Sequence, residues 1–142
     1  MRIPKKSKIA VFYGPGKGFY IEEFEIPKLK ESEILIKIDL CSICGSDIHT
    51  YTGRRSGPVP GSLGHEITGT IAAFGPNTNR KDFSGLTIEV GDRVSWLLYS
   101  FDKDDHMSRK GLPQKSYSLF KYGHEMISRS DSLHSGFAEY LI

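Results

Sequence analysis

The sequence predicts a mainly β domain, a barrel or a sandwich built from short strands. Its 142 residues include 15 Gly and 7 Pro, which implies many turns. Short apolar runs lie between those turns, and Glu33–Leu40 alternates apolar and polar side chains with the period of two expected of a half-buried strand. Together these features favour short strands over long helices.

Strands are expected wherever an apolar run lies between turn signals. In chain order the runs are Lys8–Tyr13, Phe19–Ile26, Glu33–Leu40, Ile67–Phe74, Thr87–Val90, Arg93–Leu98 and Phe137–Ile142. Thr87–Val90 and Arg93–Leu98 should form a hairpin around Gly91-Asp92. The alternation in the third run puts four side chains on one face: Ile34, Ile36, Ile38 and Leu40.

The other segments read as turns and loops. Ser46–Tyr51 predicts one short helical turn, capped by Ser46 or Asp47. Gly53–Gly64 contains glycines and prolines and is expected to be a loop. Ser100–Leu133 is polar and long for a loop in a compact domain, so it is expected to form an irregular lobe with a function or a support of its own.

The overall charge is close to neutral. Nineteen Lys and Arg stand against seventeen Asp and Glu, a net charge of +2, which gives no reason to expect a nucleic acid or a membrane as partner. The N-terminus lacks the apolar core of a signal peptide, and no apolar run approaches the ~20 residues that span a bilayer. A cytoplasmic protein is therefore expected.

A glycine-rich run, Gly14-Pro15-Gly16-Lys17-Gly18, lies between the first two expected strands. A dinucleotide fingerprint requires G-x-G-x-x-G between a strand and a helix. This run has G-x-G-x-G and precedes a strand, so it predicts a hairpin loop. Because no other stretch supplies the fingerprint, the 142 residues are not expected to bind NAD by themselves.

Two loops carry residue types that bind metal ions. Cys44 follows the Glu33–Leu40 strand, and Gly64-His65-Glu66 follows the long loop. A thiolate and an imidazole from two loops can share one zinc ion, with Glu66 as a further donor or as a neighbouring group. The residues alone also allow a structural histidine and a buried apolar cysteine. Joint binding by His65 and Glu66 requires irregular backbone, because neighbours on a regular strand face opposite ways.

Cys41 and Cys44 are the only cysteines. A secreted domain stapled by disulfides would carry more of them at wider spacing. A C-x-x-C redox pair would require a strand-to-helix setting in a βαβ fold, which this region does not offer. A metal-ligand role for Cys44 is therefore favoured over a redox role.

Four motifs, CSICGSDIH, LGHEITGTI, VGDRVSW and SGFAEYLI, resemble in order and spacing those of the zinc-dependent medium-chain alcohol dehydrogenase family. The resemblance runs from about Lys8 to Ile142. It implies a GroES-like, partly open β-barrel with short helical turns and a long irregular lobe at residues 100–133. In that family a Rossmann domain follows the barrel, so residues 1–142 are expected to be the catalytic domain, with the cofactor domain absent from them.

The same resemblance implies a metal site. Cys44 and His65 match catalytic zinc ligands, and Glu66 matches an acidic neighbour that ligates or lies close by. Cys41 matches a position that is often Cys but does not bind the metal. A remaining family ligand would lie beyond Ile142, so zinc held by these residues alone would be bound weakly.

Proton transfer is also assigned by the resemblance. Ser46 matches the hydroxyl that takes the proton of the substrate, and His49 matches the next member of a relay to solvent. Asp47 matches the carboxylate that orients the metal-bound histidine.

The lobe departs from the family pattern. Zinc-binding relatives carry four cysteines there that hold a structural zinc, and the matching places here are Asp102, Asp105, Ser108 and Ser116. None is a soft donor, so the lobe is expected to hold no structural zinc. His106 and His134 are expected to be surface loop residues.

A narrower resemblance points to alcohol dehydrogenases associated with phosphonate catabolism. It rests on Gly53-Arg54-Arg55, on Gly111-Leu112-Pro113-Gln114-Lys115 and on the run from Phe120 to Glu125. Arg54, Arg55 and Lys121 would suit a doubly charged phosphonate, or they are solvated loop charges. Gly123-His124-Glu125 repeats the Gly-His-Glu triplet with no cysteine near it in sequence.

The expected function is oxidation of a small-molecule alcohol with NAD(P)+ by a full-length zinc enzyme, with a hydroxyalkylphosphonate as candidate substrate. The isolated chain is expected to be inactive, and a homo-oligomer is compatible with the family. Two alternatives stay open: a metal-free reductase relative, and a non-enzymatic GroES-like module that acts through protein contacts.

Overall fold

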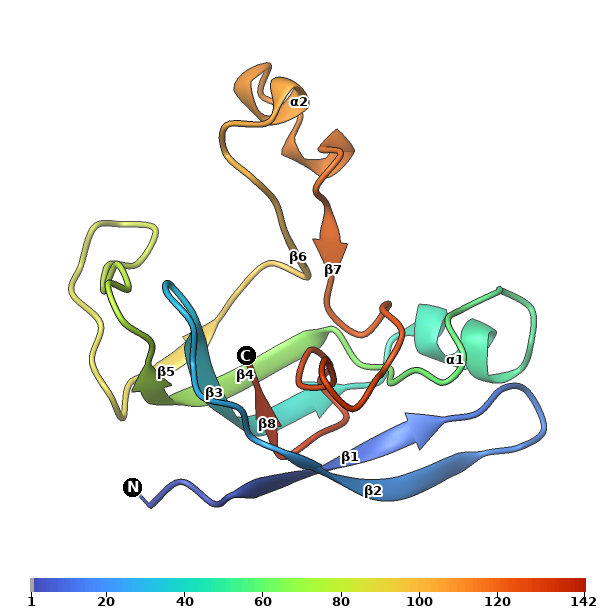
Figure 1. The fold of residues 1–142 in the computed structure, drawn as a ribbon. Coiled ribbons are helices and arrows are strands. Elements are labelled where there is room, and N and C mark those ends of the chain that lie inside the picture. The colour runs from blue at the N-terminus through green and yellow to red at the C-terminus, as the bar shows by residue number, and fades with distance from the viewer. Residues whose placement is uncertain (1) are drawn as a thin grey trace.

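The structure is a computed structural model that describes residues 2–142, and it is mainly β, as the sequence predicts (Figure 1). The strands are β1 (Lys6–Phe12), β2 (Phe19–Glu25), β3 (Ile34–Ser42), β4 (Glu66–Phe74), β5 (Arg93–Ser95), β6 (Tyr99–Ser100), β7 (Phe120–Lys121) and β8 (Tyr140–Leu141). The helical elements are α1 (Gly45–Tyr51), α2 (His106–Arg109) and the 3-10 turn η1 (Pro113–Lys115).

The strands form a barrel that does not close. β1 and β2 make an antiparallel hairpin, and a second antiparallel sheet has the order β5-β4-β3-β8. The C-terminal segment connects these two sheets. Ala10 N donates to Phe137 O and Glu139 N donates to Lys8 O, while Tyr140 pairs with Lys37 of β3. The last residues of the chain thus hold the hairpin against the four-stranded sheet.

The glycine-rich run is a hairpin loop. It joins the antiparallel partners Phe12 and Phe19, and Gly14, Gly16 and Gly18 all adopt positive φ, at 113°, 77° and 75°. Residues with a Cβ rarely adopt such angles, so the glycines are required by the turn. A strand and not a helix follows, which confirms that the run is no dinucleotide-binding turn.

The single apolar face predicted for Glu33–Leu40 is wrong. Leu35 and Ile36 are both buried, at 1% and 5% exposure, whereas Leu40 is 68% exposed. The pairing of β3 with β4 shifts register between Leu35 and Ile36 and again between Ile38 and Leu40. A bulge inserts a residue and changes which face the following side chains occupy, so the period of two holds only between the shifts.

The predicted hairpin around Gly91-Asp92 is also wrong. Residues 87–90 form no strand, and Ile88 N instead donates to Arg80 O. β5 pairs with β4, with Gly69 opposite Val94. The residues after Gly91 pair with the edge of the long strand β4. This pairing replaces the short local hairpin with residues 87–90.

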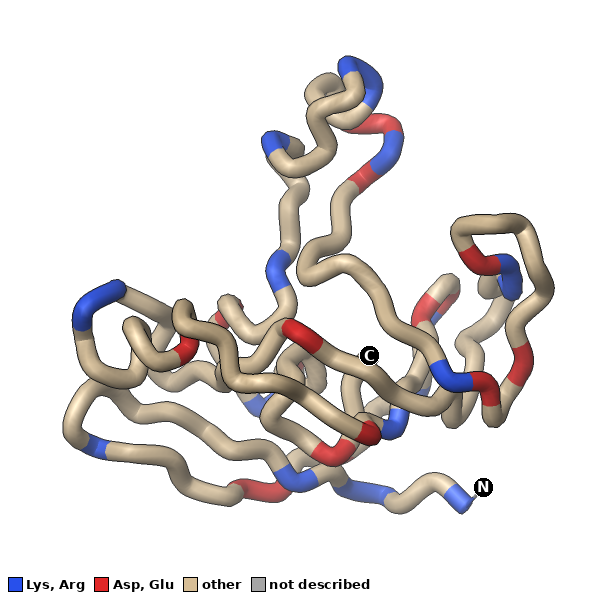
Figure 2. Tube along the Cα trace, turned by 180° about the vertical axis from the view of Figure 1, so that it is seen from behind, with Lys and Arg blue, Asp and Glu red and all other residues tan. Residues whose placement is uncertain are grey.

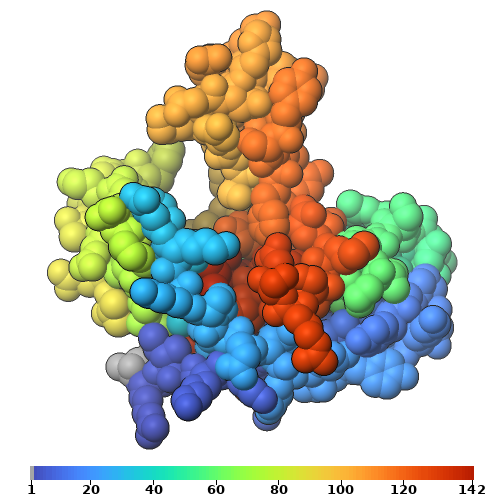
Figure 3. Space-filling view, in the orientation of Figure 1, coloured from blue at the N-terminus to red at the C-terminus, as the bar shows by residue number. Residues whose placement is uncertain are grey.

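The lobe at residues 100–133 is more ordered than the sequence predicts. β6 and β7 form an antiparallel stem, with α2 and η1 above it, and the lobe projects from the barrel (Figures 1 and 3). Asp105 caps α2 and accepts hydrogen bonds from Met107 N at 2.8 Å, Ser108 N at 3.4 Å and Tyr117 N at 3.4 Å. Burial raises the pKa of this carboxyl, but these amides outweigh it and lower the pKa overall. A carboxylate thus holds the turns of the lobe together at one of the places where the family resemblance would lead us to expect a cysteine.

Two clusters of buried apolar side chains form the core. One contains Ile9, Val11, Ile127 and Leu133, and the other contains Leu35, Ala72 and Tyr140. His134 directly follows Leu133 in the chain and is only 3% exposed, with its ring nearly perpendicular to that of Phe120. The prediction of a surface position for His134 is therefore wrong, because the segment after the lobe folds back into the barrel.

Charged residues of both signs are spread over the barrel and the lobe (Figure 2). Within residues 2–142, none of the helices has both the length and the apolar character needed to cross a membrane.

Candidate metal centre

Helix α1 begins directly after Cys44, which lies two residues beyond the end of β3. Cys44 is the N-cap residue, and Asp47 Oδ2 accepts a hydrogen bond from Cys44 N at 2.9 Å. This contact satisfies an amide that the helix itself leaves unpaired and fixes the backbone that carries the Cys44 thiol. The cap predicted at Ser46 or Asp47 therefore lies at Cys44.

The irregular backbone at Gly64 and His65 allows the adjacent side chains of His65 and Glu66 to face the same point. Gly64 has a φ of 88°, and β4 starts only at Glu66, so His65 precedes the regular strand. A Cβ on Gly64 would lie 2.5 Å from the Phe137 ring and 2.8 Å from Cys41 Sγ. Only glycine fits this close approach, which lets His65 and Glu66 turn toward the same point.

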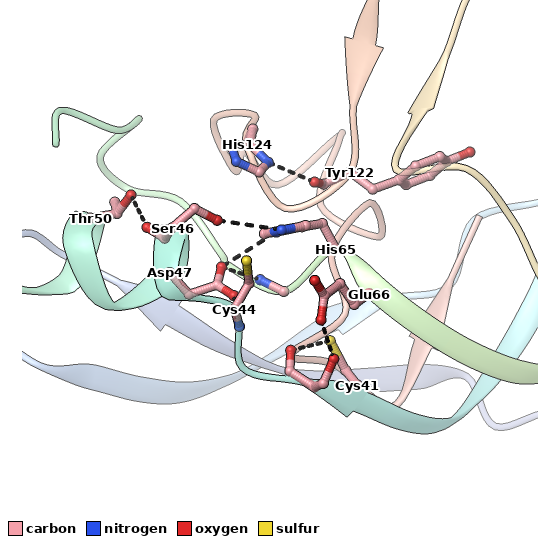
Figure 4. Close-up of polar contacts among 11 residues, drawn as sticks. Cys41, Cys44, Ser46, Asp47, Thr50, His65, Glu66, Tyr122 and His124 are labelled. Atoms are coloured by element: carbon pink, nitrogen blue, oxygen red, sulfur yellow. Dashed lines mark hydrogen bonds and ion pairs between the residues drawn. The ribbon is translucent and has the colours of Figure 1, made fainter.

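Cys44, His65 and Glu66 converge from these two places (Figure 4). One possible ligand atom from each lies within 4.8 Å of the other two. A thiolate, an imidazole and a carboxylate around one point match the three-ligand sets of catalytic zinc sites. The residues present therefore fit a zinc ion.

Asp47 connects the two loops of this cluster. The side chain is 4% exposed, and its Oδ1 accepts a hydrogen bond from Gly64 N at 3.1 Å. The same oxygen lies 3.5 Å from His65 Nδ1, a buried nitrogen with no hydrogen-bond partner within the usual distance. A carboxylate at Nδ1 holds that nitrogen as the donor and leaves Nε2 for a metal.

Glu66 is held by a residue that the sequence did not single out. Ser42 Oγ donates a hydrogen bond to Glu66 Oε2 at 2.5 Å, across the pair β3–β4. The Ser42 hydroxyl is the largest cause that lowers the pKa of Glu66, and the Cys44 thiol and His65 act in the same direction. The carboxyl is thereby stabilised as a carboxylate beside the other two donors.

Ser46 and His49 both lie on α1, but only Ser46 reaches the cluster. Ser46 Oγ is 3.4 Å from His65 Nε2. His49 is exposed, and its ring forms no hydrogen bond within the part of the chain that the structure describes. The structure thus places the expected relay residues on one helix without a direct link between them.

Cys41 stands outside the cluster. Its Sγ donates to Ser42 O at 3.6 Å and packs against Gly64 and Gly136. Burial, followed by the charge of Asp47, raises the pKa of the Cys41 thiol to about 11. Among the described residues, the ligand atoms that gather at one point are those of Cys44, His65 and Glu66, and Cys41 is not one of them.

The cations expected to bind a phosphonate are all exposed. Arg54 and Arg55 lie after α1, and Lys121 lies on β7. The charge of Arg55 is among the causes that lower the pKa of His124, after burial and His65. Arg55 N donates a hydrogen bond to His49 O, and Lys121 O accepts one from His124 N, both at 3.1 Å.

His124 is the neighbour of the cluster that sequence reasoning missed. Its ring centroid lies 4.8 Å from that of His65, and its Nδ1 lies 2.9 Å from Tyr122 O. The available signal is the second Gly-His-Glu triplet, although no cysteine lies near it in sequence. The fold brings His124 against His65, 59 residues earlier in the chain.

A partly open β-barrel that gathers Cys, His and Glu beside a buried Asp defines the class of the protein: a β domain with one candidate metal centre. The alcohol dehydrogenase GroES-like domain matches residues 30–142, and the chain belongs to this family. The relatives are oxidoreductases, so the resemblance seen in the sequence is confirmed at the level of the family.

Two relatives illustrate the similarity. Sorbitol dehydrogenase from Bacillus subtilis is 37% identical over 97 residues, which cover 66% of this chain and 25% of that protein. L-threonine 3-dehydrogenase from Vibrio parahaemolyticus is 35% identical over 99 residues, which cover 67% of this chain and 26% of that protein. The chain spans about a third or less of the length of the curated relatives it matches.

Solved structures show the same fold. The alcohol dehydrogenase from Thermotoga maritima superposes with a TM-score of 0.83 at 24% identity, over 96% of this chain and 38% of that one. The acetophenone reductase from Geotrichum candidum, in complex with NAD, gives 0.80 at 23% identity, over 99% and 38%. The cobalt- and zinc-bound alcohol dehydrogenase from Pyrobaculum aerophilum gives 0.73 at 21% identity, over 95% and 38%.

Proposed function

We propose that residues 1–142 are the catalytic domain of a zinc-dependent dehydrogenase that oxidises an alcohol with NAD(P)+, in the cytoplasm. The observation that carries this proposal is the convergence of Cys44, His65 and Glu66 within 4.8 Å. When bound there, zinc supplies Lewis-acid activation of an alcohol. A Rossmann domain outside these residues would bind the nicotinamide cofactor, as in the family.

The residues of this chain would position the alcohol and move its proton. Ser46 Oγ, 3.4 Å from His65 Nε2, would hydrogen-bond the substrate hydroxyl and take its proton. His49 is exposed on the same helix and would pass that proton to solvent. Asp47 would keep His65 in the orientation that presents Nε2. Hydride then leaves the carbinol carbon for the cofactor, and the alcohol becomes a carbonyl.

A hydroxyalkylphosphonate is a candidate substrate. Arg54, Arg55 and Lys121 are exposed cations without a salt bridge in residues 2–142. Guanidinium groups pair bidentately with phosphonate-like oxyanions. Arg55 is the best placed of the three, because its charge reaches His124 beside the cluster.

The metal proposal predicts one cobalt or zinc ion per chain. Titration of the 142-residue chain with Co²⁺ should give a thiolate-to-cobalt absorption band that saturates at one ion. Cys44→Ser should abolish the band because it removes the thiolate donor, whereas Cys41→Ala should keep it. A second tightly held zinc per chain would contradict the metal-free lobe, and an unchanged band in Cys44→Ser would contradict the site.

The domain proposal predicts that the 142-residue chain alone has no turnover. The assay combines the chain with Zn²⁺, NAD+ or NADP+ and a panel of alcohols that includes hydroxyalkylphosphonates. Reduced cofactor should not accumulate, because the described strands and loops supply no dinucleotide fingerprint. The same domain extended through the Rossmann region should be active. Turnover by the isolated chain that vanishes in Cys44→Ser would contradict the domain proposal. Binding of the chain to another protein without metal would favour the non-enzymatic GroES-like module.

A further inference from the structure

We propose that His124 is a specificity-determining residue, whose Nε2 accepts a hydrogen bond from a second hydroxyl on the carbon next to the carbinol carbon. The preferred substrate would then be a vicinal diol or a polyol. This inference rests on the proposed dehydrogenase function and names the substrate class of that same site.

The first step is the placement of His124 by backbone contact. The two Gly-His-Glu triplets meet at their glycines, since a Cβ on Gly123 would lie 2.3 Å from Gly64 O. Gly123 N also donates to His134 O at 2.9 Å. This close approach brings the ring of His124 within 4.8 Å of the ring of His65, centroid to centroid.

The second step is the direction of the imidazole. Tyr122 O can only accept, so the proton of His124 lies on Nδ1, which is 2.9 Å from that oxygen. Tyr122 is itself well anchored: its N donates to Leu98 O, and its ring makes edge contacts with Trp96 and Phe120. The ring of His124 is therefore held by one nitrogen, and Nε2 is left as an acceptor.

The third step is that Nε2 is available to a ligand. The side chain is half-buried, and Nε2 has no hydrogen-bond partner in residues 2–142. It is also absent from the fully enclosed polar atoms that lack a partner, so it is accessible to solvent. In Figure 4 His124 lies on the opposite side of the His65 ring from Glu66. It borders the site without belonging to the Cys44, His65 and Glu66 donor set.

The fourth step joins this nitrogen to the substrate. Ser46 Oγ, which would hold the reacting hydroxyl, contacts His65 Nε2, and His124 packs on the same ring. A substrate whose first hydroxyl lies at Ser46 would present its neighbouring substituent toward His124. His124 Nε2 would accept a hydrogen bond from a hydroxyl at this position, which would stabilise the bound diol. A methyl group at the same position would leave Nε2 without a partner.

The test compares butane-2,3-diol with butan-2-ol in the full-length dehydrogenase. The wild type should prefer the diol in kcat/KM by about tenfold, the order expected of one hydrogen bond. His124→Phe keeps a ring against His65 and should lose the preference. His124→Gln keeps a polar atom near the Nε2 position and should retain much of it. His124→Asn keeps only the Nδ1 position and should lose it.

Rescue by Asn but not by Gln would mean that His124 acts only through Tyr122, which overturns the inference. So would equal kcat/KM for the two alcohols in the wild type, or a lost Co²⁺ band in His124→Phe, which would make His124 a metal ligand. No turnover with any alcohol would instead overturn the proposed dehydrogenase function itself. Unchanged Co²⁺ binding together with a lost diol preference supports the inference.

Discussion

Gly123→Ala should destabilise the domain by about 3 kcal/mol or more and should weaken metal binding. A Cβ there would lie 2.3 Å from Gly64 O, 2.7 Å from Gly64 C and 3.0 Å from Gly64 N. All three are backbone atoms that cannot rotate away, so one of the two loops must move, as when a core is overpacked. Since Gly64 immediately precedes His65, that movement displaces a proposed metal donor. Denaturant unfolding and the Co²⁺ band measure the two effects.

Gly111→Ala is the matched control. Gly111 has a φ of 75° against 67° for Gly123, but a Cβ on Gly111 would meet no atom within 4 Å. It therefore reports the conformational strain of a positive φ alone, about 1–2 kcal/mol. The excess of Gly123→Ala over Gly111→Ala measures the contact between the two Gly-His-Glu triplets. Equal losses of stability in the two variants would show that the triplets do not press on each other.

Asp47→Ala should have the second large effect, about 3 kcal/mol of stability together with a 10–100-fold loss of metal affinity. Asp47 accepts from Cys44 N and Gly64 N and lies 3.5 Å from His65 Nδ1. At 4% exposure no water can replace it without rearrangement, so both amides would be left unpaired. Unfolding free energy and Co²⁺ affinity are measured on the same variant.

Asp47→Asn separates the contributions of the two oxygens. An amide has one acceptor oxygen, so this variant should keep one of the two amide contacts and lose about half of the stability that Asp47→Ala loses. Asp104→Asn is the surface control, because its ion pair with Lys103 is exposed and should contribute little. If Asp47→Ala unfolds like the wild type and binds Co²⁺ as tightly, Asp47 does not organise the site.

The residue types of the candidate site could be predicted from the sequence, because each proposed donor lies in a short motif. Cys44 and Asp47 are three residues apart, so the N-terminal geometry of a helix is enough to bring the Asp47 carboxylate to Cys44 N. His65 and Glu66 are neighbours after Gly64, whose freedom of φ permits the irregular backbone that was required. Local spacing determined these pairs.

The strand predictions were correct where the structure depends on nearby residues. They were wrong where it depends on pairing with a distant strand. The glycine loop and the β1–β2 hairpin follow from turn chemistry within a few residues. The register shifts in β3 and the pairing of β5 with β4 depend on a partner strand far away in the sequence. Periodicity within one segment carries no information about which edge a neighbouring strand will occupy.

The sequence by itself determined the β class of the fold, the candidate donors Cys44, His65 and Glu66, and the lack of cysteine in the lobe, because these depend on residue type and short spacing. Only the tertiary structure decided that Ser42 holds Glu66, that His134 is buried and that His124 lies on His65. The contact between Gly64 and Gly123 joins segments 59 residues apart. Such close approaches arise from how the barrel and lobe pack together, and no local pattern in the chain encodes them.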